Sequence, residues 1–532
     1  MNGVAIGKAV FRTGLLVILC LSLLPVEGRP ADIERIREKS QELAVKVRDA
    51  RFKAVGEGEK PGLDRAHRDF GYLLGPQKLN EVRGLVEQAA DPAEKARRQR
   101  TLEFLQHHTI WAYVAPTHDN YRSYLQTASI QAGGNEVTLL DFRHSLRTME
   151  EQNQRRIAYL AARELVTNAN VYLRSIELDL QKQTETLELG NYYDFLADYE
   201  GWNREEMAAL AQQLLDATEE KYRGLLEAMC QKLLDQELRR TRAFDVPILL
   251  AQHEFDGAFD EDKLEETFEK AFRKMGIKVD DQRYMRVDLK ERDRKDPEAH
   301  VFPIENERNT RVTMIPDGGL DDYRNFFRAM GQGQFYYNID DKLGFENRFL
   351  GNPIMPMVFG ELAVHLFQEP VWVNEMTDID DVQMQGFLEA TEFLRLYELR
   401  EAAGNYLYQL KLHKDLKTGG DVYTAQIEAA TLIPQTGNEE AFALLSNDRF
   451  QSGGILVAAV MEAQLRRHMV EAYGEEWFWK SGAGNYLKSV AGEGFSKSYT
   501  DWSEEWGANA FDATMLLQEL NGGPLGAGGG LN

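Results

Sequence analysis

The sequence predicts a mostly α-helical fold with one small β-sheet near the middle of the chain. The stretches 32–51, 140–178 and 204–237 are rich in Ala, Leu, Glu, Gln, Lys and Arg, which favour helices. Apolar residues recur in them every three or four positions, as on one face of a helix. Asn203, with Glu206 three residues later, is typical of a helix N-cap. With 532 residues, 43% of them hydrophobic, the chain can bury a large core.

The strand signals lie together in a single region. The segments 284–289, 299–304 and 310–315 alternate in polarity or carry β-branched residues, and turn-forming residues separate them. Pro316–Gly319 ends this sheet, and a new helix is expected to begin near Asp321. The sheet should therefore lead directly into a helix.

The first residues are typical of a secretory signal peptide. Lys8 and Arg12 precede the apolar stretch 14–24, and small residues follow at 26–28. A buried N-terminal helix is the alternative, but no other stretch of the chain is as apolar. The stretch is too short to span a bilayer. We expect residues 1–28 to be cleaved, leaving a secreted or periplasmic protein without a membrane attachment.

The mature chain is expected to form one helical unit over residues 29–520. A helical first part, about 29–240, precedes a second part, about 241–520, that carries the candidate site, and no linker separates them. The Gly-rich tail 521–532 is expected to be flexible. Cys230 is the only cysteine after signal cleavage, so no intramolecular disulfide is expected.

The charge and the motifs exclude several functions. A formal net charge of −24 argues against nucleic acid or an anionic membrane as a partner, because both attract basic proteins. The sequence contains no nucleophile turn of the Gly-x-Ser-x-Gly type, no phosphate-binding Walker loop and no dinucleotide fingerprint.

A segment that runs from a strand into a helix, Met314–Asn338, is the most informative part of the sequence. It contains Arg328-Ala-Met-Gly-Gln332, and further segments on both sides occur in a characteristic order. Together they cover most of residues 240–490 and resemble zinc metallopeptidases of the thimet oligopeptidase and angiotensin-converting enzyme type, the gluzincins. The segments that carry the resemblance are Asp245–Leu250, Glu254–Asp256, Gly318–Tyr323, Gln334–Tyr337, Arg348–Pro353, His365–Trp372, Glu462–Arg467, Tyr473–Trp477 and Ala483–Leu487.

The resemblance implies two helical lobes around a deep cleft, with the small sheet lining one wall. It also implies a zinc ion held by a His-Glu-x-x-His helix, in which the two His bind the metal and the Glu is the general base. The matching stretch here is Arg328–Gln332, so Arg328, Ala329 and Gln332 replace these three residues. A third zinc ligand is expected from the next helix, and its position falls on Met357, one turn before Glu361.

The replacing residues do not suit zinc hydrolysis. Arg328 has no lone pair for a metal and carries a positive charge. Gln332 offers a carbonyl oxygen, which suits Ca²⁺ or Mg²⁺ better than Zn²⁺. Ala329 cannot take a proton, and Met357 offers only a neutral thioether. We therefore predict a degenerate site without catalytic residues, metal or cofactor, although the family uses zinc.

The same helix also admits a plainer interpretation, as an amphipathic surface helix. Residues such as Phe326 would then face the core, while Arg324 and Arg328 would face solvent. This interpretation leaves Gly331 and Gly333 unexplained, because each costs up to about 1 kcal/mol in a helix interior. We favour an inherited site, in which the glycines allow close packing.

The predicted function is an exported pseudopeptidase that binds a peptide or a protein in its cleft without hydrolysis. Arg328 is a candidate anchor for a peptide carboxylate. One alternative is an active metallopeptidase with displaced ligands such as Glu361 and His365, and another is a purely structural helical partner protein. The candidate binding residues are Arg328, Gln332, Tyr323, Tyr336, Tyr337 and Glu361.

Overall fold

Helices form most of the structure, a computed structural model that describes residues 33–132 and 134–522. The predicted signal peptide and all but the first two residues of the Gly-rich tail lie outside the described residues. The predicted fold class, mostly α with a small sheet, is confirmed. Within the described part of the chain, no helix is long and apolar enough to cross a membrane.

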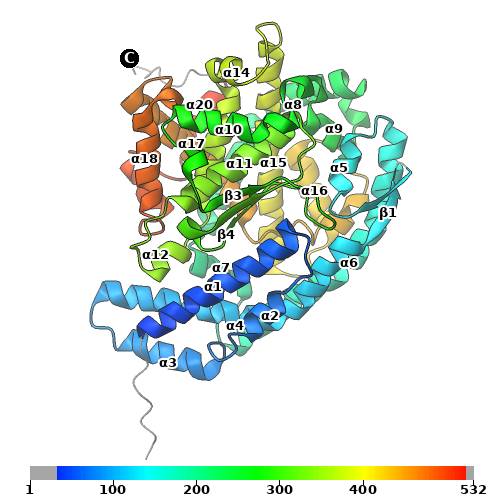
Figure 1. Cartoon of the computed structure of the whole chain (residues 1–532). Coiled ribbons are helices and arrows are strands. Elements are labelled where there is room, and N and C mark those ends of the chain that lie inside the picture. Colours follow the sequence, from blue (N-terminus) through cyan, green and yellow to red (C-terminus); the bar gives the residue numbers. More distant parts are fainter. Residues whose placement is uncertain (1–32, 133, 523–532) are drawn as a thin grey trace, which may run out of the picture.

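The N-terminal helices form a layer along one side of the molecule (Figure 1). Here α1 (Ile33–Gly56) and α2 (Leu63–Arg68) pack on the long helix α4 (Pro92–Thr127). A second long helix, α6 (Gln152–Thr186), packs along α4. The chain before residue 284 also forms a hairpin of β1 (Ser129–Ala132) and β2 (Asn135–Thr138) and the helices α3 (Pro76–Glu87), α5 (Phe142–Arg147), α7 (Tyr192–Glu200), α8 (Arg204–Leu234), α9 (Val246–Ala251) and α10 (Leu264–Lys274). Of these, α8 packs on the later helices.

The central sheet has three strands, β3 (Met285–Asp288), β4 (His300–Pro303) and β5 (Thr310–Thr313). Its order is β3-β5-β4, with β5 parallel to β3 and antiparallel to β4. Both α1 and α11 (Gly319–Tyr337) contact β4, and α11 also contacts β5. The sheet thus joins the N-terminal layer to the helix that carries the candidate site (Figure 1).

The second half of the chain packs around α11. Helix α13 (Ile354–His365) lies against α11, and α17 (Gln451–Tyr473) lies against α13 and α15 (Met384–Lys414). One hydrophobic cluster includes residues from Ile36 to Leu520, so both parts of the chain share a core. The remaining helices are α12 (Phe345–Phe349), α14 (Pro370–Met376), α16 (Gly420–Thr431), α18 (Ser481–Gly492), α19 (Tyr499–Glu505) and α20 (Thr514–Leu520).

Most of the predicted elements are confirmed, with two exceptions. The three predicted strands form, and Asn203 caps α8 by accepting a hydrogen bond from the backbone N–H of Glu206 at 3.3 Å. The predicted continuous helix over 140–178 is wrong, because residues 148–151 separate α5 from α6. The hairpin of β1 and β2, with strands of four residues each, was not predicted.

Candidate functional site

The start of α11 is fixed by two glycines and a buried aspartate. Gly318 and Gly319 have φ values of 86° and 87°, a region that L side chains rarely adopt. The carboxylate of Asp322 accepts hydrogen bonds from the backbone N–H groups of Asp317 and Gly318, at 2.6 and 3.0 Å. Burial raises the pKa of Asp322 to about 7, although these hydrogen bonds and the nearby Arg147 act to lower it. The sheet-to-helix turn therefore holds α11 in a defined direction.

Glycines allow α11 and α13 to approach closely. A Cβ atom on Gly331 would lie 2.4 Å from the carbonyl oxygen of Phe359, and one on Gly360 would lie 2.9 Å from that of Arg328. A Cβ on Gly333 would lie 2.7 Å from the side chain of Met285 at the start of β3. The two glycines of α11 thus serve close packing against α13 and the sheet, as the inherited-site interpretation expects.

Arg328 joins three helices through ion pairs. Its Nε donates to Glu361 of α13 at 2.8 Å, and its Nη2 donates to Glu398 of α15 at 2.9 Å. Glu398 also accepts a hydrogen bond from Arg324, one turn earlier on α11, at 2.9 Å. The side chain of Arg328 is 22% exposed and that of Arg324 only 2%. The plainer expectation that both arginines face solvent is therefore wrong.

The network balances its own charges. Burial alone would lower the pKa of Arg328, but Glu361 and Glu398 outweigh burial and raise it. Burial alone would likewise raise the pKa of Glu398, but Arg324 and Arg328 outweigh burial, and the pKa is lowered. Arg328 and Glu398 are thus held in their charged forms, and the network brings two arginines against two carboxylates.

The other candidate positions, Ala329, Gln332 and Met357, lie on α11 and α13. Ala329 is 4% exposed. Gln332 is partly exposed, and its Cγ would lie 3.0 Å from a Cβ placed on Gly360 of α13. The sulfur of Met357 faces α17, where a Cβ placed on Gly454 would lie 3.3 Å from it.

Glu361 and His365 bind different partners, although they lie on one face of α13. Glu361 pairs with Arg328, whereas His365 Nε2 lies 3.1 Å from Glu369 and its Nδ1 lies 3.9 Å from Glu462. Glu462 also pairs with Arg466 in a buried ionic cluster. Among the described residues, no group of three or more His, Cys, Asp or Glu has the geometry to hold a metal ion.

The three candidate tyrosines differ in their surroundings. Tyr323 is buried and donates a hydrogen bond to the carbonyl oxygen of Asp260 at 2.6 Å. Tyr336 and Tyr337 are partly exposed, and burial raises the pKa of Tyr336 to about 12, against the nearby Arg48. Tyr336 and Tyr337 thus remain accessible, while Tyr323 has a packing role.

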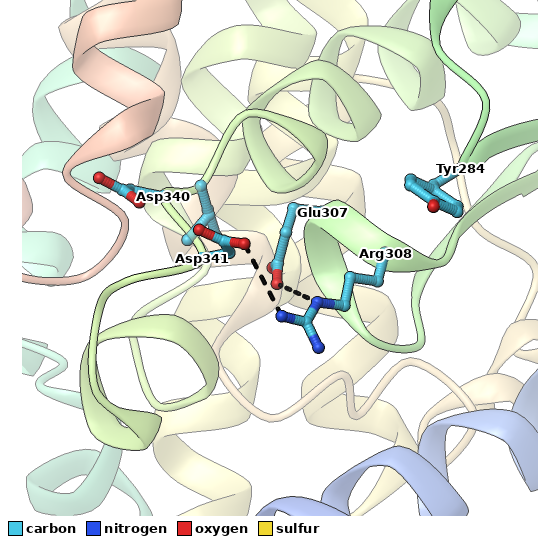
Figure 2. A pocket seen from close by; sticks show the side chains of 6 residues that line it. Tyr284, Glu307, Arg308, Asp340 and Asp341 are labelled. Atoms are coloured by element: carbon cyan, nitrogen blue, oxygen red, sulfur yellow. Dashed lines mark ion pairs between the residues drawn. The ribbon is translucent and has the colours of Figure 1, made fainter.

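A hollow of about 560 Å³ lies at the end of α11 (Figure 2). Arg308 lies between Glu307 and Asp341, at 3.6 and 3.7 Å. The arginine therefore already has acidic partners within the hollow. Its lining residues are Tyr284, Glu307, Arg308, Ile339, Asp340 and Asp341.

Sequence reasoning missed Glu398 and the part that Arg324 plays. Glu398 lies in the middle of α15, a long helix without a motif, 70 residues from Arg328. The position of Arg324 one turn before Arg328 was the only available signal, and it does not identify an acidic partner.

Solved structures of other proteins share this fold. No protein-family model and no curated protein sequence matches the chain. The solved structure of PZ peptidase A with inhibitor 2 superimposes with a TM-score of 0.64 at 12% identity, covering 93% of this chain and 97% of that one. A putative oligoendopeptidase F from Bacillus anthracis str. Ames gives a TM-score of 0.61 at 14% identity, covering 93% and 96%. The chain therefore has the fold of these oligopeptidases over nearly its whole length.

Proposed function

We propose that this protein is an exported pseudopeptidase, which binds a peptide or protein segment inside an oligopeptidase fold without cleaving it. One observation carries the proposal. At the position of the His-Glu-x-x-His helix, a guanidinium group is bonded to two carboxylates, those of Glu361 and Glu398.

The residues at this position do not fit a zinc ion. The guanidinium of Arg328 lies where metal ligands are expected and has no lone pair to donate. Its partner Glu361 is the nearest carboxylate to the expected third ligand, and it is already paired. Ala329 offers no base, and the thioether of Met357 is a weak zinc ligand. We therefore derive no hydrolytic step through a metal at this site.

The displaced-ligand alternative has less support. It needs Glu361 and His365 to converge on one metal, but Glu361 pairs with Arg328 and His365 with Glu369. The thiol of Cys230 is no substitute as a nucleophile, because burial raises its pKa and the group is fully buried.

Binding is supported by partly exposed polar side chains whose surroundings disfavour charge. Tyr336 and Glu200 are both partly exposed, yet burial raises the pKa of Tyr336 to about 12 and that of Glu200 to about 7. Both side chains are therefore partly exposed in surroundings that disfavour their charged forms, and both can hydrogen-bond a bound peptide. A peptide carboxylate at Arg328, however, would have to compete with Glu361 and Glu398.

The test compares the natural protein with a restored variant. The mature natural protein is loaded with zinc, dialysed and measured by mass spectrometry, and its hydrolysis and binding of fluorescent peptides are followed. We expect no retained zinc, no hydrolysis and measurable peptide binding. The matched variant carries Arg328→His, Ala329→Glu, Gln332→His and Met357→Glu, and it should retain zinc. Stoichiometric zinc with chelator-sensitive hydrolysis in the natural protein would refute the proposal.

A further inference from the structure

Two arginines from distant parts of the chain lie over one tryptophan ring. Arg51 belongs to α1, and Arg449 lies just before α17. Their guanidinium carbons are 5.8 and 5.3 Å from the centroid of Trp111 on α4. The indole N–H of Trp111 donates to the hydroxyl of Tyr192 at 3.2 Å, which fixes the ring. Arg51 is exposed and the side chain of Arg449 is 27% exposed, so a ligand can reach both.

The positive charge of this pair is only partly neutralised. Arg449 donates one hydrogen bond to Glu177 at 2.9 Å, while its Nε is buried without a partner. Arg51 has no hydrogen bond or ion pair to any described residue, and Trp111 is its neighbour in space. Glu200 is close enough to interact electrostatically with both arginines. The pair therefore keeps excess positive charge in a chain whose formal net charge is −24.

Neutral hydrogen-bonding groups surround the pair. His107 and His118 each have a buried Nδ1 without a partner. The ring of His107 stacks on Tyr199 with centroids 5.1 Å apart, and that of His118 lies 5.8 Å from Trp111. Burial, and then the nearby Arg51, lower the pKa of both histidines to about 3. They are uncharged at neutral pH and offer polar nitrogens without adding charge.

The backbone that presents Arg449 is strained. Arg449 and Phe450 have φ values of 54° and 76°, and two consecutive non-glycine residues in this region are costly. Burial of the Phe450 ring, with its centroid 4.9 Å from that of His413, opposes the strain. The backbone N–H of Phe450 also donates to Gln409 at 3.3 Å. Strain that is maintained in this way is more common at binding sites than elsewhere.

The pair lies on the same side of α1 as the end of the site helix. Arg48, three residues before Arg51 on α1, interacts electrostatically with Tyr336 of α11 and with Tyr199. Tyr199 in turn stacks on His107. The groups around Arg51 therefore continue towards the C-terminal half of α11.

We propose that Arg51 and Arg449 together bind a carboxylate, the free C-terminus of a peptide held inside the fold. Both guanidinium groups lie within 6 Å of the centroid of one indole ring, close enough for Arg449 to lower the pKa of Arg51 after burial. A planar carboxylate can accept hydrogen bonds from two such groups. This inference rests on the proposed function, because it names the group by which the bound peptide is recognised. A small organic acid carries the same group and is the other possible source of the bound carboxylate.

The experiment measures binding by the full mature protein with two matched probes. A fluorescein-labelled mixed-sequence hexapeptide pool with free C-termini is compared, by anisotropy, with the same pool amidated at the C-terminus. Succinate, titrated by calorimetry, represents a small acid. The variants are Arg51→Gln and Arg449→Gln, with Arg449→Lys in reserve because Arg449→Gln leaves Glu177 unpaired. Arg35→Gln on the exposed face of the same helix is the control.

We expect the free-acid pool to bind at least about tenfold more tightly than the amidated pool, the difference of one charge-assisted contact. Arg51→Gln and Arg449→Gln should remove this preference, and Arg35→Gln should keep it. Arg51-dependent binding of succinate without peptide binding would support the carboxylate site and count against the proposed function. Equal binding of both pools, unchanged in Arg51→Gln, would overturn the inference while leaving peptide binding intact. Binding of neither probe would overturn it as well.

Discussion

Replacing Arg328 tests whether its ion pairs hold the candidate site together. Arg328→Met keeps most of the side-chain volume but leaves Glu361 without its 2.8 Å partner, while Glu398 keeps Arg324. Breaking a fully buried pair costs about 3–5 kcal/mol, and exposed pairs contribute about 0–1 kcal/mol. Glu361 and Arg328 are 20% and 22% exposed, so we expect a loss of about 2 kcal/mol in the free energy of unfolding.

A double-mutant cycle with Glu361→Gln isolates the pair. Urea unfolding at pH 7 is measured for the natural protein, both single variants and the double variant. The double variant should lose less than the sum of the singles, with a coupling energy of about 1–2 kcal/mol. The exposed pair Arg223–Glu219, with side chains 46% and 50% exposed, serves as the control and should couple by less than about 0.5 kcal/mol. A coupling at Arg328 no larger than this control would refute the reasoning.

Three further predictions concern packing and pH. Gly331→Ala should lower the free energy of unfolding by about 2 kcal/mol or more, because its Cβ would lie 2.4 Å from a carbonyl oxygen of α13. Gly224→Ala, in open space on α8, should be neutral or stabilising in the same urea titration, and equal effects would contradict the close approach. The raised pKa of Asp322, about 7 against an ordinary 3.8, means that the folded protein retains a proton that the unfolded chain releases between pH 4 and 7. Stability should therefore fall as pH rises through this window, by at most about 4 kcal/mol from this group. Asp322→Asn should flatten the profile of unfolding free energy against pH, and an unchanged profile would count against the raised pKa. Binding of free-acid peptides should weaken by up to about tenfold from pH 6 to 8, as Glu200, with a pKa of about 7, ionises beside the arginine pair. Glu200→Gln should remove that dependence, and its persistence in the variant would assign it to another group.

Local patterns predicted the parts of the fold that depend on neighbouring residues. The three strands of the central sheet and the turn into α11 follow from β-branched residues, Pro and Gly within one short region. Gly331 and Gly333 indicated close packing, because glycine in a helix interior is otherwise costly. The break between α5 and α6 was missed, because a helical composition continues across it.

Contacts between distant segments were not predictable in the same way. Arg51 and Arg449 lie far apart in the sequence, and only the packing of α1 and α4 with the segment before α17 brings them to one ring. Glu398 likewise reaches Arg328 only because the fold brings α15 within side-chain reach of α11. Arg51, Arg449 and Glu398 lie in no motif. A lone Arg or Glu is usually a solvated side chain.

Under the proposed function, the arginine at position 328 is better explained by a site kept for binding than by one that has lost its use. Without a cation at this position, Glu398 would keep Arg324, but Glu361 would lose its partner and leave one negative charge unpaired within the fold. Arg328 restores neutrality and joins α11, α13 and α15, as a metal ion that draws ligands from several helices does. A protein that needed only to fold could have replaced the carboxylates with apolar residues, which is often neutral or stabilising. Under the proposed function, two carboxylates balanced by two arginines keep this part of the fold polar and fixed in position, which suits binding of an extended peptide.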